Sequence, residues 1–109
     1  MSDCLFCKIA SGNIPAKIVA QTENLVAFND ISPQAPVHIL IVPKEHIESV
    51  RDLRENQAYL LGEMALMAKR LGVGADFRLV MNTGAGAGQS VFHLHMHLLS
   101  GRDLGWPPG

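Results

Sequence analysis

The sequence lacks any long apolar run, any excess of one charge and any internal repeat. No stretch approaches the roughly 18 consecutive apolar residues that a membrane-spanning helix requires, so we expect no membrane partner. Nine basic residues are balanced by ten acidic ones, for a net charge of −1. Because sequence-independent binding to DNA or RNA needs a clustered basic surface, this balance argues against a nucleic-acid partner.

The chain is also poor in cysteine, and its start lacks the basic residues and apolar stretch of a secretory signal peptide. We therefore expect a cytoplasmic protein. In that compartment Cys4 and Cys7 should stay reduced, so metal binding or redox chemistry is expected of them rather than a structural disulfide. The length of 109 residues and the 48% share of hydrophobic residues predict one globular domain over residues 1–109.

The order of the predicted elements indicates an α+β domain. Strands are expected at 18–21, 25–29, 37–42, 77–82 and 95–99. A short helix is expected at 4–11 and a long one at about 52–71, where apolar residues form a stripe and Asp52 with Glu55 resembles a capping box. We expect a five-stranded, mainly antiparallel sheet whose one face the long helix covers. The other face should then be solvated, paired with another chain or functional.

Three histidines alternate near the end of the chain, in His93-Leu94-His95-Met96-His97. Alternate residues of a strand point to the same side, so the imidazoles are expected on one exposed face, with Leu94 and Met96 in the core. A merely solvated strand face usually carries Thr, Lys, Glu or Ser. One zinc ion shared by all three is disfavoured, because the ends of the run lie about 13 Å apart in a straight strand.

A glycine-rich segment, residues 83–90, directly precedes the histidines. Glycine adopts positive φ readily, so such a segment can bring backbone N–H groups to an anion. It matches neither the dinucleotide fingerprint, because Gln89 replaces the third glycine, nor a P-loop. Phosphate-binding donors beside imidazoles indicate phosphoryl or nucleotidyl transfer, since neutral imidazole is a nucleophile near pH 7 and a second histidine can act on the leaving group.

The histidine run resembles the signature of the histidine triad superfamily, His-x-His-x-His followed by apolar residues. Segments 28–38, 88–91 and 106–109 resemble one branch of it, the histidine triad nucleotide-binding proteins. The resemblance runs from about residue 3 to the last residue. It implies a homodimer whose two five-stranded sheets join into one. It also implies hydrolysis of purine nucleoside 5′-phosphoramidates and aminoacyl-adenylates to the nucleoside monophosphate, through a nucleotidyl-histidine and without a cofactor.

The resemblance further implies roles for particular residues. His95 matches the nucleophile, with its ring oriented by a backbone carbonyl near His93, while His97, His38 and Ser90 match its catalytic partners. Asp30 matches the carboxylate that accepts hydrogen bonds from the ribose hydroxyls. The residues that match contacts to the nucleotide are Leu5, Phe6, Ile9, Phe28, Asp30, Ile31, Asn82, Gly88, Gln89, Ser90, Val91, His95 and His97. The apolar members would wall the purine, and they do not distinguish adenine from guanine.

The pair Cys4 and Cys7 has two interpretations. By itself it predicts two reduced cysteines on a short helix. In some members of the superfamily, however, a CxxC pair, a histidine at the position of His46 and the first triad histidine form a structural zinc site, whereas other members lack the cysteines. The resemblance thus implies Cys4, Cys7, His46 and His93 as ligands of a structural zinc ion, a chemically sound Cys₂His₂ set.

Two other functions stay open on the sequence alone. A nucleotide-responsive binding protein would bind AMP tightly with negligible turnover, and a zinc-binding module would hold one zinc ion without affinity for nucleotides. Hydrolysis is favoured over transfer to a second substrate, because glutamine replaces His97 in the nucleotidyltransferase branch of the superfamily.

Overall fold

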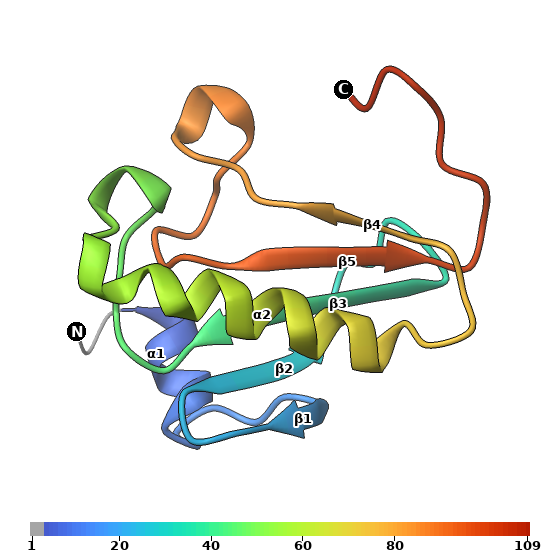
Figure 1. Cartoon of the computed structure of the whole chain (residues 1–109). Coiled ribbons are helices and arrows are strands. Elements are labelled where there is room, and N and C mark those ends of the chain that lie inside the picture. The colour runs from blue at the N-terminus through green and yellow to red at the C-terminus, as the bar shows by residue number, and fades with distance from the viewer. Residues whose placement is uncertain (1–3) are drawn as a thin grey trace.

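The computed structural model describes residues 4–109, so the first three residues of the predicted domain lie outside the described part. Five strands form one antiparallel sheet in the order β1-β2-β3-β5-β4 (Figure 1). The strands are β1 (Ile18–Gln21), β2 (Leu25–Asn29), β3 (Val37–Pro43), β4 (Phe77–Val80) and β5 (Met96–Ser100). The predicted α+β fold with a five-stranded antiparallel sheet is therefore confirmed.

Two α-helices accompany the sheet, α1 (Leu5–Ala10) and α2 (Ala58–Leu71). Three short 3₁₀ turns lie at Val50–Asp52, Glu55–Gln57 and Ala85–Ala87. The short helix is confirmed and lies within the predicted range. Cys4 precedes it, and the Cys4 sulfur accepts the backbone N–H of Cys7 and so caps the first turn. Within residues 4–109, no helix is both long and apolar enough to cross a membrane.

The sheet packs on both of its faces. The long helix α2 lies across one face, as Figure 1 shows, and closes the main core. The buried members of this core are Leu25, Ala27, Ile39, Ile41, Ile47, Leu60, Met64, Met67, Ala68, Leu94, Met96 and Leu98. On the opposite face, Phe6 and Ile9 of α1 pack against β2 and β3 in a second cluster. The face whose cover the sequence left open is thus partly covered by α1.

The long helix begins later than predicted, at Ala58 rather than Asp52. Leu53 has extended backbone (φ −70°, ψ 129°) and separates two 3₁₀ turns. The Ser49 hydroxyl donates to Asp52 Oδ2 at 3.0 Å, so Asp52 closes its own turn and does not cap the helix. The predicted capping box of Asp52 with Glu55 is therefore wrong. The apolar stripe predicts the body of the helix but carries no information about these side-chain bonds.

Four strand ends also differ from the prediction, two of them because β3 and β5 each extend one residue further, to Pro43 and Ser100. β5 begins at Met96 rather than His95, and β4 ends at Val80 rather than Asn82. The His95 ring bonds to its own backbone two residues upstream, so this segment leaves the regular ladder before the strand starts. Asn82 instead opens the loop that leads into the glycine-rich segment.

Candidate active site

A cavity of about 330 Å³ lies on the face of the sheet that α1 partly covers. Ten of the residues predicted to bind nucleotide line it: Leu5, Phe6, Ile9, Phe28, Asp30, Ile31, Ser90, Val91, His95 and His97. Six further lining residues were not predicted from the sequence: Ile14, Pro15, Ala16, Asn29, Ser32 and Leu40. Most of the six are apolar or proline, and nothing in the pattern separates such residues from ordinary core or turn positions.

The histidines do not lie on an exposed face, which corrects the sequence-based expectation. His93 is fully buried and His95 is 7% exposed. Phe6 of α1 packs edge-on against both rings, with centroid distances of 6.0 Å to His93 and 5.1 Å to His95. The predicted alternation is retained, because Leu94 and Met96 point into the main core on the other side. Burial therefore places the rings of His93 and His95 in a water-poor environment.

The ring of His95 is held by one short hydrogen bond. Its Nδ1 lies 2.6 Å from the carbonyl oxygen of His93, the type of contact that the resemblance implied. A carbonyl can only accept, so Nδ1 carries the proton and Nε2 keeps its lone pair. Burial lowers the pKa of His95 below its ordinary value. At neutral pH the ring is therefore an uncharged imidazole with one nucleophilic nitrogen.

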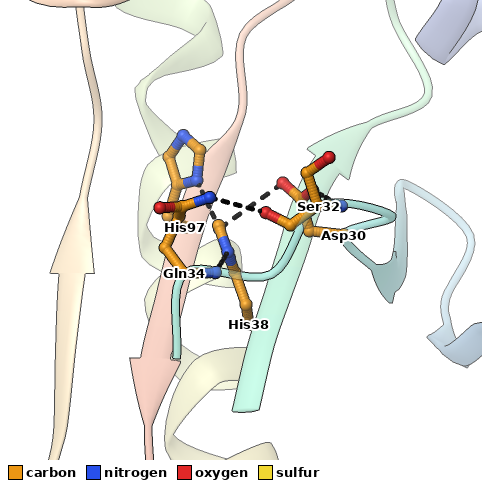
Figure 2. A network of polar contacts seen from close by, with 5 residues as sticks. All are labelled: Asp30, Ser32, Gln34, His38 and His97. Atoms are coloured by element: carbon orange, nitrogen blue, oxygen red, sulfur yellow. Dashed lines mark hydrogen bonds and ion pairs between the residues drawn. The ribbon is translucent and has the colours of Figure 1, made fainter. Parts of the chain in front are cut away.

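A second chain of hydrogen bonds fixes the tautomers of His38 and His97 (Figure 2). The backbone N–H of Gln34 donates to His38 Nδ1 at 3.0 Å, so the proton of a neutral His38 sits on Nε2. His38 Nε2 donates in turn to His97 Nδ1 at 2.9 Å. The remaining proton of His97 must then be on Nε2. His97 lines the cavity, whereas His38 is not one of its lining residues.

His97 stays uncharged for a clear physical reason. Burial, followed by the neighbouring His95 and His38 rings, lowers the pKa of His97 to about 4. An added proton also has no good position: a proton on His97 Nδ1 would face the Nε2–H of His38. His97 is therefore built as a neutral hydrogen-bond donor rather than as an imidazolium.

Asp30 closes the turn that leads from β2 to Gln34 and His38. Its Oδ1 accepts the backbone N–H of Ser32 at 2.7 Å, and its Oδ2 lies 3.5 Å from His38 Nε2 (Figure 2). Asp30 also lines the cavity. One carboxylate thus shapes the loop between β2 and β3 and faces the cavity.

The glycine-rich segment adopts the positive φ angles that its composition predicted, at Gly84 (φ 88°) and Gly88 (φ 97°). Only some of the residues predicted here to contact the ligand line the cavity. Ser90 does, but Asn82, Gly88 and Gln89 are not among the lining residues. Asn82 packs instead near Gly88, where an added Cβ would lie 3.5 Å from Asn82 Nδ2.

The side chain of Gln89 is buried within the loop and does not face the cavity. Its Oε1 accepts the N–H of Gly84 at 2.9 Å, and its Nε2 donates to the carbonyls of Glu48 and Val91 at 2.7 and 3.1 Å. Gln89 is 3% exposed. The bonds of this side chain hold the segment that carries Ser90 in place, and a contact between Gln89 and nucleotide stays a prediction.

The four predicted metal ligands converge at the start of α1. One ligand atom from each of Cys4, Cys7, His46 and His93 lies within 4.8 Å of the others. The Sγ–Nδ1 distances are 3.3 Å for Cys4–His93, 3.3 Å for Cys7–His46 and 3.5 Å for Cys7–His93. Zn–S and Zn–N bonds of about 2.3 and 2.0 Å at a tetrahedral angle would separate such atoms by about 3.5 Å. The spacing fits a tetrahedral ion.

The protonation pattern of the cluster also fits a metal. His93 Nε2 donates to the carbonyl oxygen of Pro43 at 2.7 Å, which leaves Nδ1 unprotonated toward the sulfurs. Burial lowers the pKa of His93 to about 4, so the ring is neutral. Burial and the adjacent Cys4 thiol raise the pKa of Cys7 to about 11, so a bound cation would have to displace the thiol proton.

Comparison with known proteins gives this geometry a family. The HIT domain matches residues 11–104, which is most of the chain. The chain belongs to the HIT domain family. An uncharacterized HIT-like protein of Synechocystis is 47% identical over 98% of this chain and 97% of its own length. The predicted membership of the histidine triad superfamily is therefore confirmed.

Solved HIT structures agree with the fold. The HIT family hydrolase from Legionella pneumophila is 48% identical, with a TM-score of 0.94, and the match covers 98% of this chain and 100% of that one. A histidine triad protein from Clostridium difficile is 39% identical, with a TM-score of 0.93 and 96% of both chains covered. The HIT fold thus extends over nearly the whole chain.

Proposed function

We propose that this HIT protein hydrolyses purine nucleoside 5′-phosphoramidates and aminoacyl-adenylates to the nucleoside monophosphate, as a member of the nucleotide-binding branch. One observation carries the proposal: the His95 Nδ1–H bond to the His93 carbonyl leaves a nucleophilic Nε2 on a ring that lines the cavity. The hydrolase name of the Legionella relative is in keeping with it.

In the first step, His95 Nε2 attacks the 5′-phosphorus and forms a bond to it. The bond from phosphorus to the leaving group breaks, and that group is the amine of a phosphoramidate or the carboxylate of an aminoacyl-adenylate. His97 lines the same cavity and directs a fixed Nε2–H donor, which stabilises charge on a phosphate oxygen or the leaving nitrogen. A departing amine takes a proton from water, whereas a departing carboxylate needs none. Water then cleaves the bond between phosphorus and His95, which releases the nucleoside monophosphate.

The cavity walls match a nucleoside. The apolar residues of α1 and Phe28 offer surfaces on which a purine ring can lie, as buried aromatic and aliphatic groups do in small-molecule sites. Asp30 reaches the cavity with a carboxylate that can accept hydrogen bonds from the ribose hydroxyls. Ser90 lines the same cavity, and its hydroxyl can donate a hydrogen bond to a phosphate oxygen.

We also propose a structural zinc ion at Cys4, Cys7, His46 and His93, with no cofactor required for the reaction itself. The tetrahedral spacing and the free Nδ1 of His93 support it. When bound, the ion would tie the start of α1 to the segments around His46 and His93. Cys4 and Cys7 form no disulfide, so both sulfurs are available to the ion, and a cytoplasmic location remains part of the proposal.

A homodimer is the expected assembly. β4 is an edge strand of four residues, and Phe77 and Leu79 on it are each more than a third exposed. An edge strand with unpaired backbone groups and exposed apolar side chains can pair with a second copy of the same strand. We propose that the two sheets join there.

The proposal is tested by measuring the turnover of a substrate panel. The panel contains adenosine and guanosine 5′-phosphoramidates, adenylates and dinucleoside polyphosphates. The purified protein should release AMP from adenosine 5′-phosphoramidate, and His95→Ala should abolish release while its circular dichroism spectrum stays unchanged. Phe92→Ala, at a half-exposed ring near the triad, should retain turnover. Normal turnover by His95→Ala would refute the mechanism. Tight AMP binding without any turnover by the unaltered protein would favour a nucleotide-responsive binding protein.

A further inference from the structure

Arg102 makes a contact that nothing in the chemistry above uses. It lies two residues beyond β5, and its Nη2 donates to the carbonyl oxygen of Gln34 at 2.9 Å, while Nη1 donates to its neighbour Asp103 at 2.9 Å. Gln34 is the residue whose N–H donates to His38 Nδ1. The same residue is therefore held by an arginine at its carbonyl and holds a histidine with its amide.

We propose that Arg102 is a positioning residue for the His38–His97 pair. By holding Gln34 it keeps the Gln34 N–H on His38 Nδ1, and so keeps the His97 proton on Nε2, the ring nitrogen that is not bonded to His38. The effect on turnover rests on the proposed function, whereas the effect on the tautomers does not.

The loop around Gln34 is otherwise held by its own residues. Ser32 N–H bonds to Asp30, and Gln34 Nε2 donates to the Ser32 carbonyl at 3.0 Å (Figure 2). These are local bonds across two residues, and Ser32 and Gln34 are both exposed. Such bonds shape a turn, whereas the link of the loop to β5 comes from the pairing of Val37 with Ser100 at the end of the loop and from Arg102 at Gln34. Arg102 adds a bond that spans 68 residues of sequence.

The backbone beside Arg102 brings β5 and this loop together. Gly101 has a φ of 94°, and a Cβ added there would lie 2.8 Å from Cβ of Pro36, so the two segments approach closely. His97 sits on β5, three residues before Ser100. A closed circuit results, from β5 through Arg102 and Gln34 to His38, and back through His97 to β5.

The geometry requires an arginine rather than just a positive charge. Two nitrogens of one planar guanidinium reach the Gln34 and Asp103 carbonyls together. A lysine keeps the charge, but its single nitrogen on a flexible stem does not hold two carbonyls in that fixed fork. Arg102→Lys should therefore be intermediate between the unaltered protein and Arg102→Gln.

The test is ¹⁵N NMR of histidine-labelled protein without substrate, which distinguishes protonated from unprotonated ring nitrogens. The unaltered protein should show His38 and His97 each protonated at Nε2 alone. Arg102→Gln should show a mixture of the two neutral tautomers for these rings, with His95 unchanged. Arg70→Gln, at an exposed arginine in the last turn of α2, is the matched control and should leave all tautomers unchanged.

Turnover provides the second readout. Arg102→Gln should lower kcat between about twofold and about tenfold, the range expected for one hydrogen bond, with KM unchanged. Unchanged tautomers in a folded Arg102→Gln protein would overturn the proposal, whatever the turnover. An equal change of the His38 and His97 tautomers in Arg70→Gln would also overturn the proposal. If Arg102→Gln does not fold, Arg102→Lys serves in its place. If no phosphoramidate is cleaved, the proposed function fails, and the NMR spectra still decide the positioning role.

Discussion

Replacing Gln89 by leucine tests the assignment of this side chain to the loop. The change keeps a side chain of similar size at a position that is 3% exposed, but it removes three hydrogen bonds. They involve the N–H of Gly84 and the carbonyls of Glu48 and Val91. The loop would keep its backbone hydrogen bonds but lose its side-chain bonds to Glu48 and Val91, so the position of Ser90 would be less fixed.

The magnitude follows from those three bonds. A net hydrogen bond contributes about 1 kcal/mol, and a buried group left without a partner costs about 1–3 kcal/mol. Glu48 is exposed, and Gly84 and Val91 are half-buried, so water can partly replace the lost partner. We therefore expect Gln89→Leu to lower the free energy of unfolding by about 2–4 kcal/mol. The free energy of unfolding of a small domain is about 5–15 kcal/mol, so this loss is a large part of it but still leaves the variant folded.

Urea unfolding measures the stability, and turnover of the folded variant measures the site. The matched control is Gln57→Leu, since Gln57 is also buried (6% exposed) and makes two hydrogen bonds with its side chain, to the Arg54 N–H and to Glu45. Both variants should be destabilised, but only Gln89→Leu should lose turnover, by about tenfold, because Ser90 shifts. A loss below about 0.5 kcal/mol for Gln89→Leu would refute the reasoning, as would equal loss of turnover in both variants.

Three further predictions concern pH, metal and assembly. The pKa of His97 is about 4 in the folded protein against an ordinary 6.5, so the unfolded chain binds more protons between these values and stability should fall by up to about 3 kcal/mol as pH falls from 6.5 to 4. Urea unfolding over this range should show a shallower fall for His97→Gln, and identical slopes would contradict the assignment. The isolated protein should contain one zinc ion per chain by elemental analysis, and Cys7→Ser should lose it and unfold at a lower temperature; retention of zinc by that variant would exclude the ligand set. Sedimentation should show a dimer that Leu79→Lys converts to monomers, and a monomeric unaltered protein at micromolar concentration would argue against pairing at β4.

The elements that depend on side-chain periodicity could be predicted well from the sequence. β1 and β2 have the predicted bounds, because apolar runs bounded by polar turn residues determine both ends. The start of α2 could not be predicted, since it depends on which partners the Ser49 and Gln57 side chains choose. Local competition between side chain and backbone leaves no periodic signal.

Some features of the candidate site could also be predicted from the sequence, and others could not. Residues within motifs, such as His95 and Asp30, were identified by resemblance and line the cavity. The resemblance implied the carbonyl that orients His95. The proton positions of His38, His93 and His97 were not predictable, because they depend on Gln34 and Pro43, whose backbone groups reach the rings only in the folded chain. The role of Arg102 was hidden for the same reason, since the residue it holds is 68 positions away.

The central claim is that His95 Nε2 becomes covalently nucleotidylated. The most direct measurement is rapid mixing of the protein with adenosine 5′-phosphoramidate, an alkaline quench that preserves the bond between phosphorus and nitrogen, and mass spectrometry of the digested chain. We predict a transient adenylyl group on His95, formed before AMP appears and absent from His95→Ala. AMP release at full rate with no adduct at any time, or with the adduct on His97 or His38, would contradict the account.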